Sequence, residues 1–181
     1  MNPDANAPPR KLLLVDDEPE ILDLLGELLR PICDEVLTAN NGVEALAIVE
    51  NDPEICAILS DIQMPLMDGL ELLSRIRAQF NPIPFVVLTA FGDAKSYQQA
   101  IRLNATDFLV KPIVLIELQE VMIKAIQYGV AVSHLNQTLD QILSQERIPV
   151  EIAESIKRAR RTVMLMRIEN SIYIQNKSRK S

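Results

Sequence analysis

The sequence predicts a doubly wound α/β fold, in which helices cover both faces of a five-stranded parallel sheet, followed by a helical extension. Five short apolar runs alternate with amphipathic helical patterns, which is typical of a parallel sheet. The first, third, fourth and fifth of these runs end at polar residues capable of chemistry. The 181 residues, of which 48% are hydrophobic, suffice for one domain with a substantial core and an appendage.

The alternation starts at residue 11 and continues at regular spacing. Each expected strand is a short apolar run, and each expected helix has apolar residues three and four positions apart. The expected strands are Lys11–Val15, Glu35–Thr38, Cys56–Leu59, Phe85–Leu88 and Asp107–Val110, and the expected helices between them are Glu20–Arg30, Gly42–Glu50, Asp68–Phe80 and Ala94–Leu103. Right-handed crossovers between parallel strands then favour a flavodoxin-like sheet.

Polar side chains stand at the carboxyl ends of four strands, where functional groups gather in such sheets. They are Asp16 and Asp17, Asp61, Thr89 and Lys111. Three carboxylates brought together repel one another and raise one another's pKa unless a cation intervenes. Mg²⁺ suits this position best, because it accepts one or two carboxylates and leaves room for water and a phosphoryl oxygen.

The two remaining side chains complete a site for phosphoryl chemistry. The ammonium of Lys111 can pair with Asp61 and later with a phosphoryl group. The hydroxyl of Thr89 can turn toward such a group and donate a hydrogen bond. The set fits an aspartate that attacks phosphorus in line while Mg²⁺ and lysine offset the developing charge.

Four segments together resemble the receiver domain of two-component response regulators. They are Val15–Glu18 (VDDE), Leu59–Pro65 (LSDIQMP) followed by Gly69, Leu88–Ala90 (LTA) and Asp107–Pro112 (DFLVKP). The resemblance covers about residues 10–130 in order, spacing and strand context. It implies a phosphoacceptor signalling protein of the cytoplasm, not an enzyme beyond its own Mg²⁺-dependent phosphorylation and dephosphorylation, with a sensor histidine kinase as partner.

The resemblance also implies a role for each site residue. Asp61 is the phosphoacceptor, and it binds Mg²⁺ directly together with Asp17 and the backbone carbonyl of Gln63. Asp16 contributes mainly through the water shell of the metal. Lys111 contacts the phosphoryl group and is joined to Pro112 by a cis peptide bond.

The implied switch pair is Thr89 and Phe108. Tyrosine is frequent at the aromatic position, but Phe108 has no hydroxyl, so its coupling must rest on packing. We hypothesise that the bulk of Phe91 slows dephosphorylation. Two alternatives are a degenerate receiver, although no acidic residue or lysine is missing, and an aspartate-nucleophile phosphatase, which needs an acid where Gln63 stands.

The expected organisation is a disordered lead-in at 1–9, a receiver domain at 10–128 and a helical extension at 129–181. The first residues lack the basic start and apolar run of a signal peptide, and no apolar run is long enough to span a membrane. Cys33 and Cys56 show no metal-ligand spacing, so we expect two reduced, buried thiols.

The extension carries a heptad-like apolar stripe. Its members step by four and three residues: Val114, Leu118, Val121, Ala125, Tyr128, Val132, Leu135, Leu139 and Ile142. We expect this helix to continue to about residue 147 and a second helix to span about 149–173. An antiparallel hairpin of this kind predicts a coiled coil or four-helix bundle, and hence a homodimer or a site for a downstream protein partner.

Charge divides the chain unevenly. Residues 1–112 contain 8 Lys and Arg against 18 Asp and Glu, whereas residues 148–181 contain 8 against 3. The basic cluster Lys157, Arg158, Arg160 and Arg161 predicts either nucleic-acid contact or, as we favour, a solvated face or pairing with the acidic receiver. His134, the only histidine, leaves open a phosphorelay role, although the acidic residue and proline usual around a phosphohistidine are absent.

Overall fold

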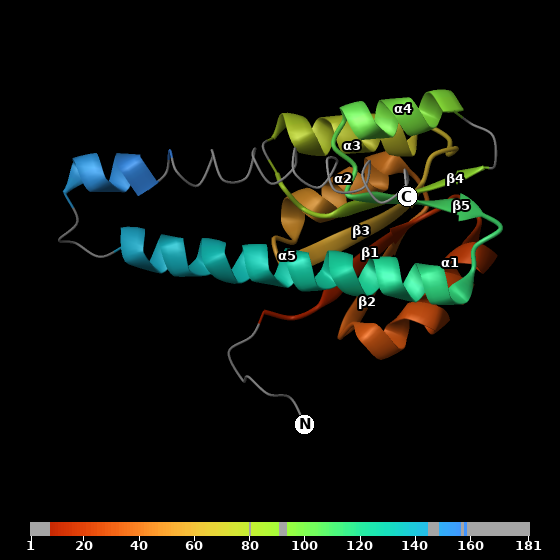
Figure 1. Cartoon of the computed structure of the whole chain (residues 1–181), viewed down its shortest axis with the longest axis horizontal. Helices are drawn as coiled ribbons and strands as arrows, with labels where there is room; N and C mark the ends of the chain where they lie inside the picture. The colour runs from red at the N-terminus through yellow and green to blue at the C-terminus, as the bar shows by residue number, and fades with distance from the viewer. Residues whose placement is uncertain (1–7, 80, 91–93, 145–148, 157, 159–181) are drawn as a thin grey trace, which may run out of the picture.

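A computed structural model describes residues 8–79, 81–90, 94–144, 149–156 and 158. Five parallel strands form one sheet in the order β2-β1-β3-β4-β5 (Figure 1). They are β1 (Lys11–Val15), β2 (Glu35–Ala39), β3 (Ile55–Asp61), β4 (Phe85–Ala90) and β5 (Asp107–Lys111). This order confirms the predicted flavodoxin-like, doubly wound sheet.

Helices cover both faces of this sheet. They are α1 (Pro19–Leu29), α2 (Gly42–Asn51), α3 (Gly69–Ala78), α4 (Ala94–Arg102) and α5 (Leu115–Leu143), with a 3₁₀ turn at Arg30–Ile32. The core residues of α2, α3 and α4 pack on one face and those of α1 and α5 on the other, which gives two separate apolar clusters. The strands and the first four helices differ from the predicted bounds by at most two residues.

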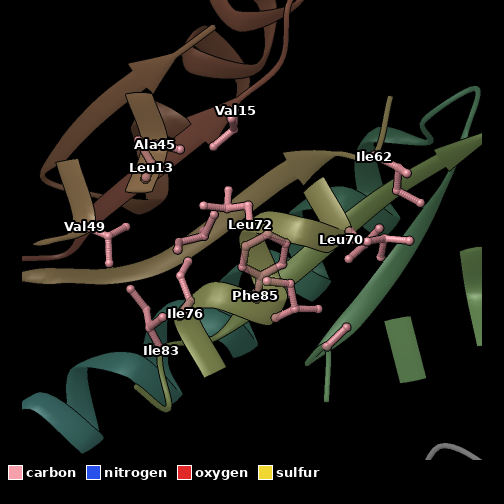
Figure 2. Packing of buried hydrophobic residues seen from close by; sticks show 14 of the residues in the cluster. Leu13, Val15, Ala45, Val49, Ile62, Leu70, Leu72, Ile76, Ile83 and Phe85 are labelled. Carbon is pink, nitrogen blue, oxygen red and sulfur yellow. The ribbon is translucent and has the colours of Figure 1, made fainter. Parts of the chain in front are cut away.

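The central strand β3 is buried along its whole length because both of its faces are covered. Alternate side chains enter opposite clusters, with Ile58 in one and Leu59 in the other. Figure 2 shows Phe85 of β4 packed near Leu72 and Ile76 of α3 in the first of these clusters. The sheet is therefore a rigid platform for the residues at its ends.

Helix caps set where the connecting loops end. The side chain of Asn41 accepts hydrogen bonds from the first backbone N–H groups of α2, and Asp68 accepts one from Glu71 at 2.7 Å in α3. Pro19 occupies the first turn of α1, where its missing N–H costs nothing. These local signals place the loops that follow β1, β2 and β3.

The long helix α5 crosses the sheet and continues past it (Figure 1). Its first half buries Leu118, Met122, Ala125 and Ile126 against the sheet. Gly129 marks the closest approach, because a Cβ there would collide with the backbone carbonyl of Cys56. A side chain is excluded at this point, so the glycine sets the distance between helix and strand.

The predicted apolar stripe is therefore divided. Leu118 and Ala125 lie in the core of the domain, because the sheet needs a wide apolar face of the helix. Beyond the sheet, Leu135 is 47% exposed and Ile142 is 38% exposed. The members from Tyr128 onward lie outside the core, and at the start of the stripe Val114 is 58% exposed.

The second tail segment is described in part. Residues 150–156 are helical, and Figure 1 shows them turned back in the direction of the sheet. The rest of the predicted second helix, most of the basic cluster and residues 1–7 of the predicted lead-in lie outside the described residues. Across the described residues, the structure contains no helix that combines the length and the apolar character needed to span a membrane.

Candidate functional site

The five residues predicted from the strand ends lie together at the carboxyl edge of the sheet. Asp16 and Asp17 follow β1, Asp61 ends β3, Thr89 lies near the end of β4 and Lys111 ends β5. The parallel register brings these ends together. All but Asp16 line one cavity of about 280 Å³, to which Glu18, Ile62 and Gln63 also contribute.

Three carboxylates converge at this edge of the sheet. One oxygen each from Asp16, Asp17 and Asp61 lies within 4.8 Å of the others. Asp16 is fully buried and Asp61 is 9% exposed, whereas Asp17 is open to solvent. An all-oxygen set with one open side fits a hard cation such as Mg²⁺, which retains water ligands.

Lys111 contacts two of the three acids. Its Nζ lies 3.3 Å from Oδ2 of Asp16 and 3.2 Å from Oδ1 of Asp61. Burial lowers the pKa of Lys111, but Asp61 and Asp16 more than offset this, so its pKa is raised and the ammonium stays charged. One ammonium faces three carboxylates, so the site keeps an excess of negative charge.

Burial also changes the pKa of Asp61, the candidate phosphoacceptor. Burial raises this pKa, Lys111 lowers it, and the neighbouring Asp16 raises it further, so the net shift is upward. The charged form of Asp61 is thus held in an unfavourable environment by the fold. A bound cation would relieve the same repulsion, so the electrostatics and the oxygen donor set both fit Mg²⁺.

The backbone around Asp61 is fixed by contacts that the sequence did not reveal. The hydroxyl of Ser60 donates to the Asp61 carbonyl at 2.8 Å, and Ile62 N–H donates to the Leu88 carbonyl at 3.2 Å. Gly69 N–H donates to the Ile62 carbonyl, and any side chain at Gly69 would collide with the Asp61 carbonyl. The glycine was part of the quoted motif, but its steric reason appears only in the fold.

The predicted switch residues are both buried. Thr89 lines the cavity, and Phe108 is 6% exposed on the side of the sheet covered by α4. The ring of Phe108 lies 4.3 Å from that of Tyr97 in α4, tilted by 57°. Tyr97 was not predicted, and the only signal for it was an aromatic residue in the pattern of that helix. Phe91 lies outside the described residues.

The peptide bond between Lys111 and Pro112 is cis, which confirms that expectation. The remaining candidates lie elsewhere. His134 is exposed on α5, 19 residues beyond Leu115, which corresponds to roughly 28 Å of helix. This length of helix separates His134 from the carboxyl edge, where Asp61 lies. Arg158 is exposed in the second helical segment, and the other three basic residues lie outside the described part.

A parallel sheet with buried acids and a lysine at its carboxyl edge fits a domain that accepts a phosphoryl group on a carboxylate. The family profile of the response regulator receiver domain matches residues 12–123. The chain belongs to this family. Receiver domains are phosphorylated by sensor histidine kinases and generally bind Mg²⁺ at an acidic pocket.

Similar proteins include transcriptional regulators. The chain is 34% identical to the transcriptional regulatory protein ZraR of Salmonella typhimurium over 117 residues, which are 65% of this chain and 26% of ZraR. It is 38% identical to the CpxR homolog of Haemophilus influenzae over 102 residues, 56% of this chain and 44% of that protein. The chain thus spans less than half the length of these curated relatives.

Solved receiver structures are similar over the same region. The receiver domain of NtrX from Brucella abortus has a TM-score of 0.59 at 34% identity, covering 64% of this chain and 98% of that one. The chemotaxis protein CheY4 of Vibrio cholerae has a TM-score of 0.59 at 32% identity, covering 64% and 97%. The family profile ends within α5, so the second half of this helix lies beyond it.

Proposed function

We propose that this protein is a phosphorylation-controlled response regulator in which Asp61 accepts a phosphoryl group from a sensor histidine kinase. The observation that carries this proposal is the convergence of three carboxylate oxygens within 4.8 Å beside Lys111. In this proposal Asp17, Asp61 and the Gln63 carbonyl hold Mg²⁺. Asp16 acts through the water shell of the metal.

The proposed step is an in-line displacement. An oxygen of Asp61 forms a bond to phosphorus as the bond from phosphorus to the kinase imidazole nitrogen breaks, and the imidazole leaves with that electron pair. Lys111 pairs with the incoming phosphoryl oxygens, and Thr89 donates its hydroxyl to one of them. When bound, Mg²⁺ supplies positive charge that stabilises the developing negative charge.

We propose that the buried rings of Phe108 and Tyr97 shift when Asp61 is phosphorylated. Movement of Thr89 toward the phosphoryl group changes the space available to Phe108, and through it to Tyr97. Since Phe108 lacks a hydroxyl, packing alone transmits the change. The proposed shielding by Phe91 predicts that Phe91→Ala shortens the half-life of the phosphorylated protein, measured by loss of label from Asp61.

The tail is proposed to be the output element. The exposed stripe of α5 and the exposed Val150 and Ile152 of the second segment need an apolar partner. Two hairpins packed as a four-helix bundle satisfy this need in a homodimer. In the alternative form of this proposal, a downstream protein docks on the same apolar faces.

The test combines phosphorylation with oligomeric state. Wild type and Asp61→Asn are incubated with a small phosphodonor and Mg²⁺, and their masses are measured by light scattering. We expect labelling of wild type only, a dimer through the tail, and a monomer when Leu135→Glu and Ile142→Glu are combined. An unlabelled wild type contradicts the phosphoacceptor, and a monomeric wild type in both states contradicts the dimer.

DNA binding by the basic tail is the second candidate, favoured by relatives that are named transcriptional regulators. Its test is retention on DNA that falls with salt and with Arg160→Ala and Arg161→Ala. A phosphorelay role for His134 would require transfer between copies. Acid-labile phosphate on His134 after incubation with the phosphorylated domain is its test.

A further inference from the structure

Leu66 combines two properties that are unusual for a large apolar residue. Its side chain is 84% exposed, the largest fraction among the large hydrophobic residues of the described part. Its φ of 67° lies in the left-handed region, which a leucine rarely adopts. It stands in the loop between β3 and α3, five residues after Asp61. Neither packing nor backbone conformation favours a leucine at this position.

The conformation of Leu66 belongs to a tight turn. Met67 N–H donates to the Pro65 carbonyl at 2.7 Å, which closes a three-residue γ-turn around Leu66. A γ-turn with positive φ at its centre is the rare, strained form. The other described non-glycine residue with positive φ is Asn104, which tolerates this conformation and lies just after α4, where helices often end in this way. Asn104 therefore has a local reason for its conformation, and Leu66 does not.

The rest of the loop holds the strained turn in place. The Met67 carbonyl accepts from Gly42 N–H at 3.1 Å, at the start of α2, and Gly69 N–H donates to the Ile62 carbonyl at 3.0 Å. The side chain of Met67 is buried in the apolar cluster that α2, α3 and α4 cover. These anchors fix Leu66 toward solvent. Strained residues that are held in this way cluster at functional positions.

The same loop forms part of the cavity at Asp61. Ile62 and Gln63 line this cavity, and Leu66 follows Gln63 by three residues, which span at most about 10 Å. A protein that delivers a phosphoryl group must cover the open side of the cavity, because in-line attack requires close approach of phosphorus to Asp61. A protein interface covers about 800 Å² on each partner, so it extends well beyond this distance. Leu66 thus lies within reach of such a protein.

Leu66 differs in character from the other exposed residues of this region. Asp17, Glu18 and Gln63 are exposed lining residues of the cavity, and all three are polar. Exposed charges guide the approach of a partner but contribute little affinity. Burial of an exposed leucine side chain favours binding by roughly tenfold or more. A small phosphodonor has no surface that could bury Leu66, so only a protein donor gains from it.

We propose that Leu66 is a specificity-determining contact for the sensor histidine kinase, which buries this side chain in an apolar pocket while its phosphohistidine enters the cavity. This inference rests on the proposed function, because it concerns the partner that phosphorylates Asp61. The strained turn holds Leu66 outward before the kinase binds, so little conformational entropy is lost on association. Leu66 contributes to binding and not to the chemical step.

The test compares a protein donor with a small donor. The protein donor is the phosphorylated core that labels wild type fastest among a panel of purified histidine kinases, and the small donor is phosphoramidate with Mg²⁺. We expect Leu66→Asn, which tolerates a positive φ, to raise the KM for the kinase core roughly ten- to thirtyfold with kcat unchanged. Labelling by phosphoramidate should not change, and the urea midpoint should stay the same or rise because strain is relieved.

Three further variants separate the side chain from the turn. Leu66→Gly removes both the side chain and the strain, and it should match Leu66→Asn in KM. Leu66→Met keeps an apolar side chain of similar volume and should restore the KM to within about threefold of wild type. Val150 is 77% exposed in the second helical segment, so Val150→Asn is the matched control and should leave the KM unchanged.

Several outcomes would overturn the proposal. Equal KM values for wild type and Leu66→Asn would do so while leaving Asp61 as the phosphoacceptor. Equal slowing with both donors would place the effect of Leu66 inside the cavity. A change in oligomeric mass of Leu66→Asn without a change in KM would assign the side chain to a second copy. A wild type that phosphoramidate labels but no kinase core labels would contradict the kinase as partner, and a wild type that neither donor labels would contradict the proposed function itself.

Discussion

Two charged clusters, one at each edge of the sheet, both contain one lysine and three carboxylates but arrange them differently. At the foot edge, which is the edge opposite the carboxyl ends of the strands, Nζ of Lys11 contacts Glu35, Asp52 and Glu54 at 3.5, 3.0 and 2.8 Å. The carboxylates there are 25–49% exposed, and water screens their mutual repulsion. The lysine lies at the centre of the cluster and contacts every acid.

At the carboxyl edge the acids converge on one another instead. Lys111 contacts Asp16 and Asp61, and among the described residues no ion pair involves Asp17. Two of these acids are buried, so burial raises the pKa of Asp61 and repulsion from Asp16 adds to this. The comparison indicates that carboxylates which each contact a central lysine stabilise the fold. Carboxylates that face one another, with only one lysine beside two of them, instead favour the binding of a cation.

The largest expected difference between the edges is in phosphorylation. Asp17→Asn removes a proposed Mg²⁺ ligand, so the rate of labelling by a small phosphodonor should fall by roughly a hundred- to a thousandfold. The matched foot-edge change Asp52→Asn should leave the rate unchanged. Equal losses in both variants would mean that the carboxyl edge has no special role.

The next largest effect concerns packing at the foot edge. Gly129→Val places a side chain against the Cys56 carbonyl and should lower the free energy of unfolding by about 2–3 kcal/mol, measured by urea denaturation. In the control Gly26→Ala, the new Cβ meets nothing within 4 Å, so stability should rise by up to about 1 kcal/mol. A tolerated Gly129→Val would show that α5 approaches β3 less closely.

Removing one acid should change stability in opposite directions at the two edges. Without Mg²⁺, Asp61→Asn relieves repulsion and should raise the free energy of unfolding by about 1 kcal/mol, whereas Asp52→Asn should lower it by less than about 1 kcal/mol. Added Mg²⁺ should raise the Tm of wild type more than that of Asp61→Asn. If the free energy of unfolding changed in the same direction in both variants, the proposed difference between the two edges would be wrong.

The smallest expected effect is the pH dependence of the foot edge. Burial raises the pKa of Asp52, but Lys11 and the Glu54 N–H more than offset this, so its pKa is lowered. A lowered pKa gives stability that is present above the unfolded pKa, near about 4, and is lost as pH falls through the folded value. The stability difference between wild type and Asp52→Asn should therefore shrink by a few tenths of a kcal/mol between about pH 5 and pH 3.

The sheet and its carboxyl edge could be predicted because their signals are local. Each strand is a short apolar run, and a parallel arrangement brings the residues that end the strands to one edge. Asp61, Thr89 and Lys111 therefore followed from position as well as from motif. The cis bond before Pro112 and the burial of Phe108 agree with the family resemblance.

The details that failed depend on contacts between distant parts of the chain. Nothing in the sequence near Gly129 shows that this is the position where α5 approaches Cys56 most closely. Leu118 and Ala125 fitted a heptad stripe, and no periodicity could show that the sheet would cover them. The contact of Tyr97 with Phe108 could not be predicted either, because it forms only when α4 and β5 come together.

The length of α5 gives the molecule a mechanical property. The helix has 29 residues, about 43 Å, and Gly129 lies at its midpoint, 14 residues from each end. Its first turn follows Lys111 and Pro112 at the carboxyl edge, and its last turn lies beyond the foot edge. The first half is packed on the sheet through Leu118, Met122, Ala125 and Ile126, so the half beyond Gly129 projects from the domain as a rod of about 21 Å. A tilt of about 5° at Gly129 displaces the end of this rod by roughly 2 Å.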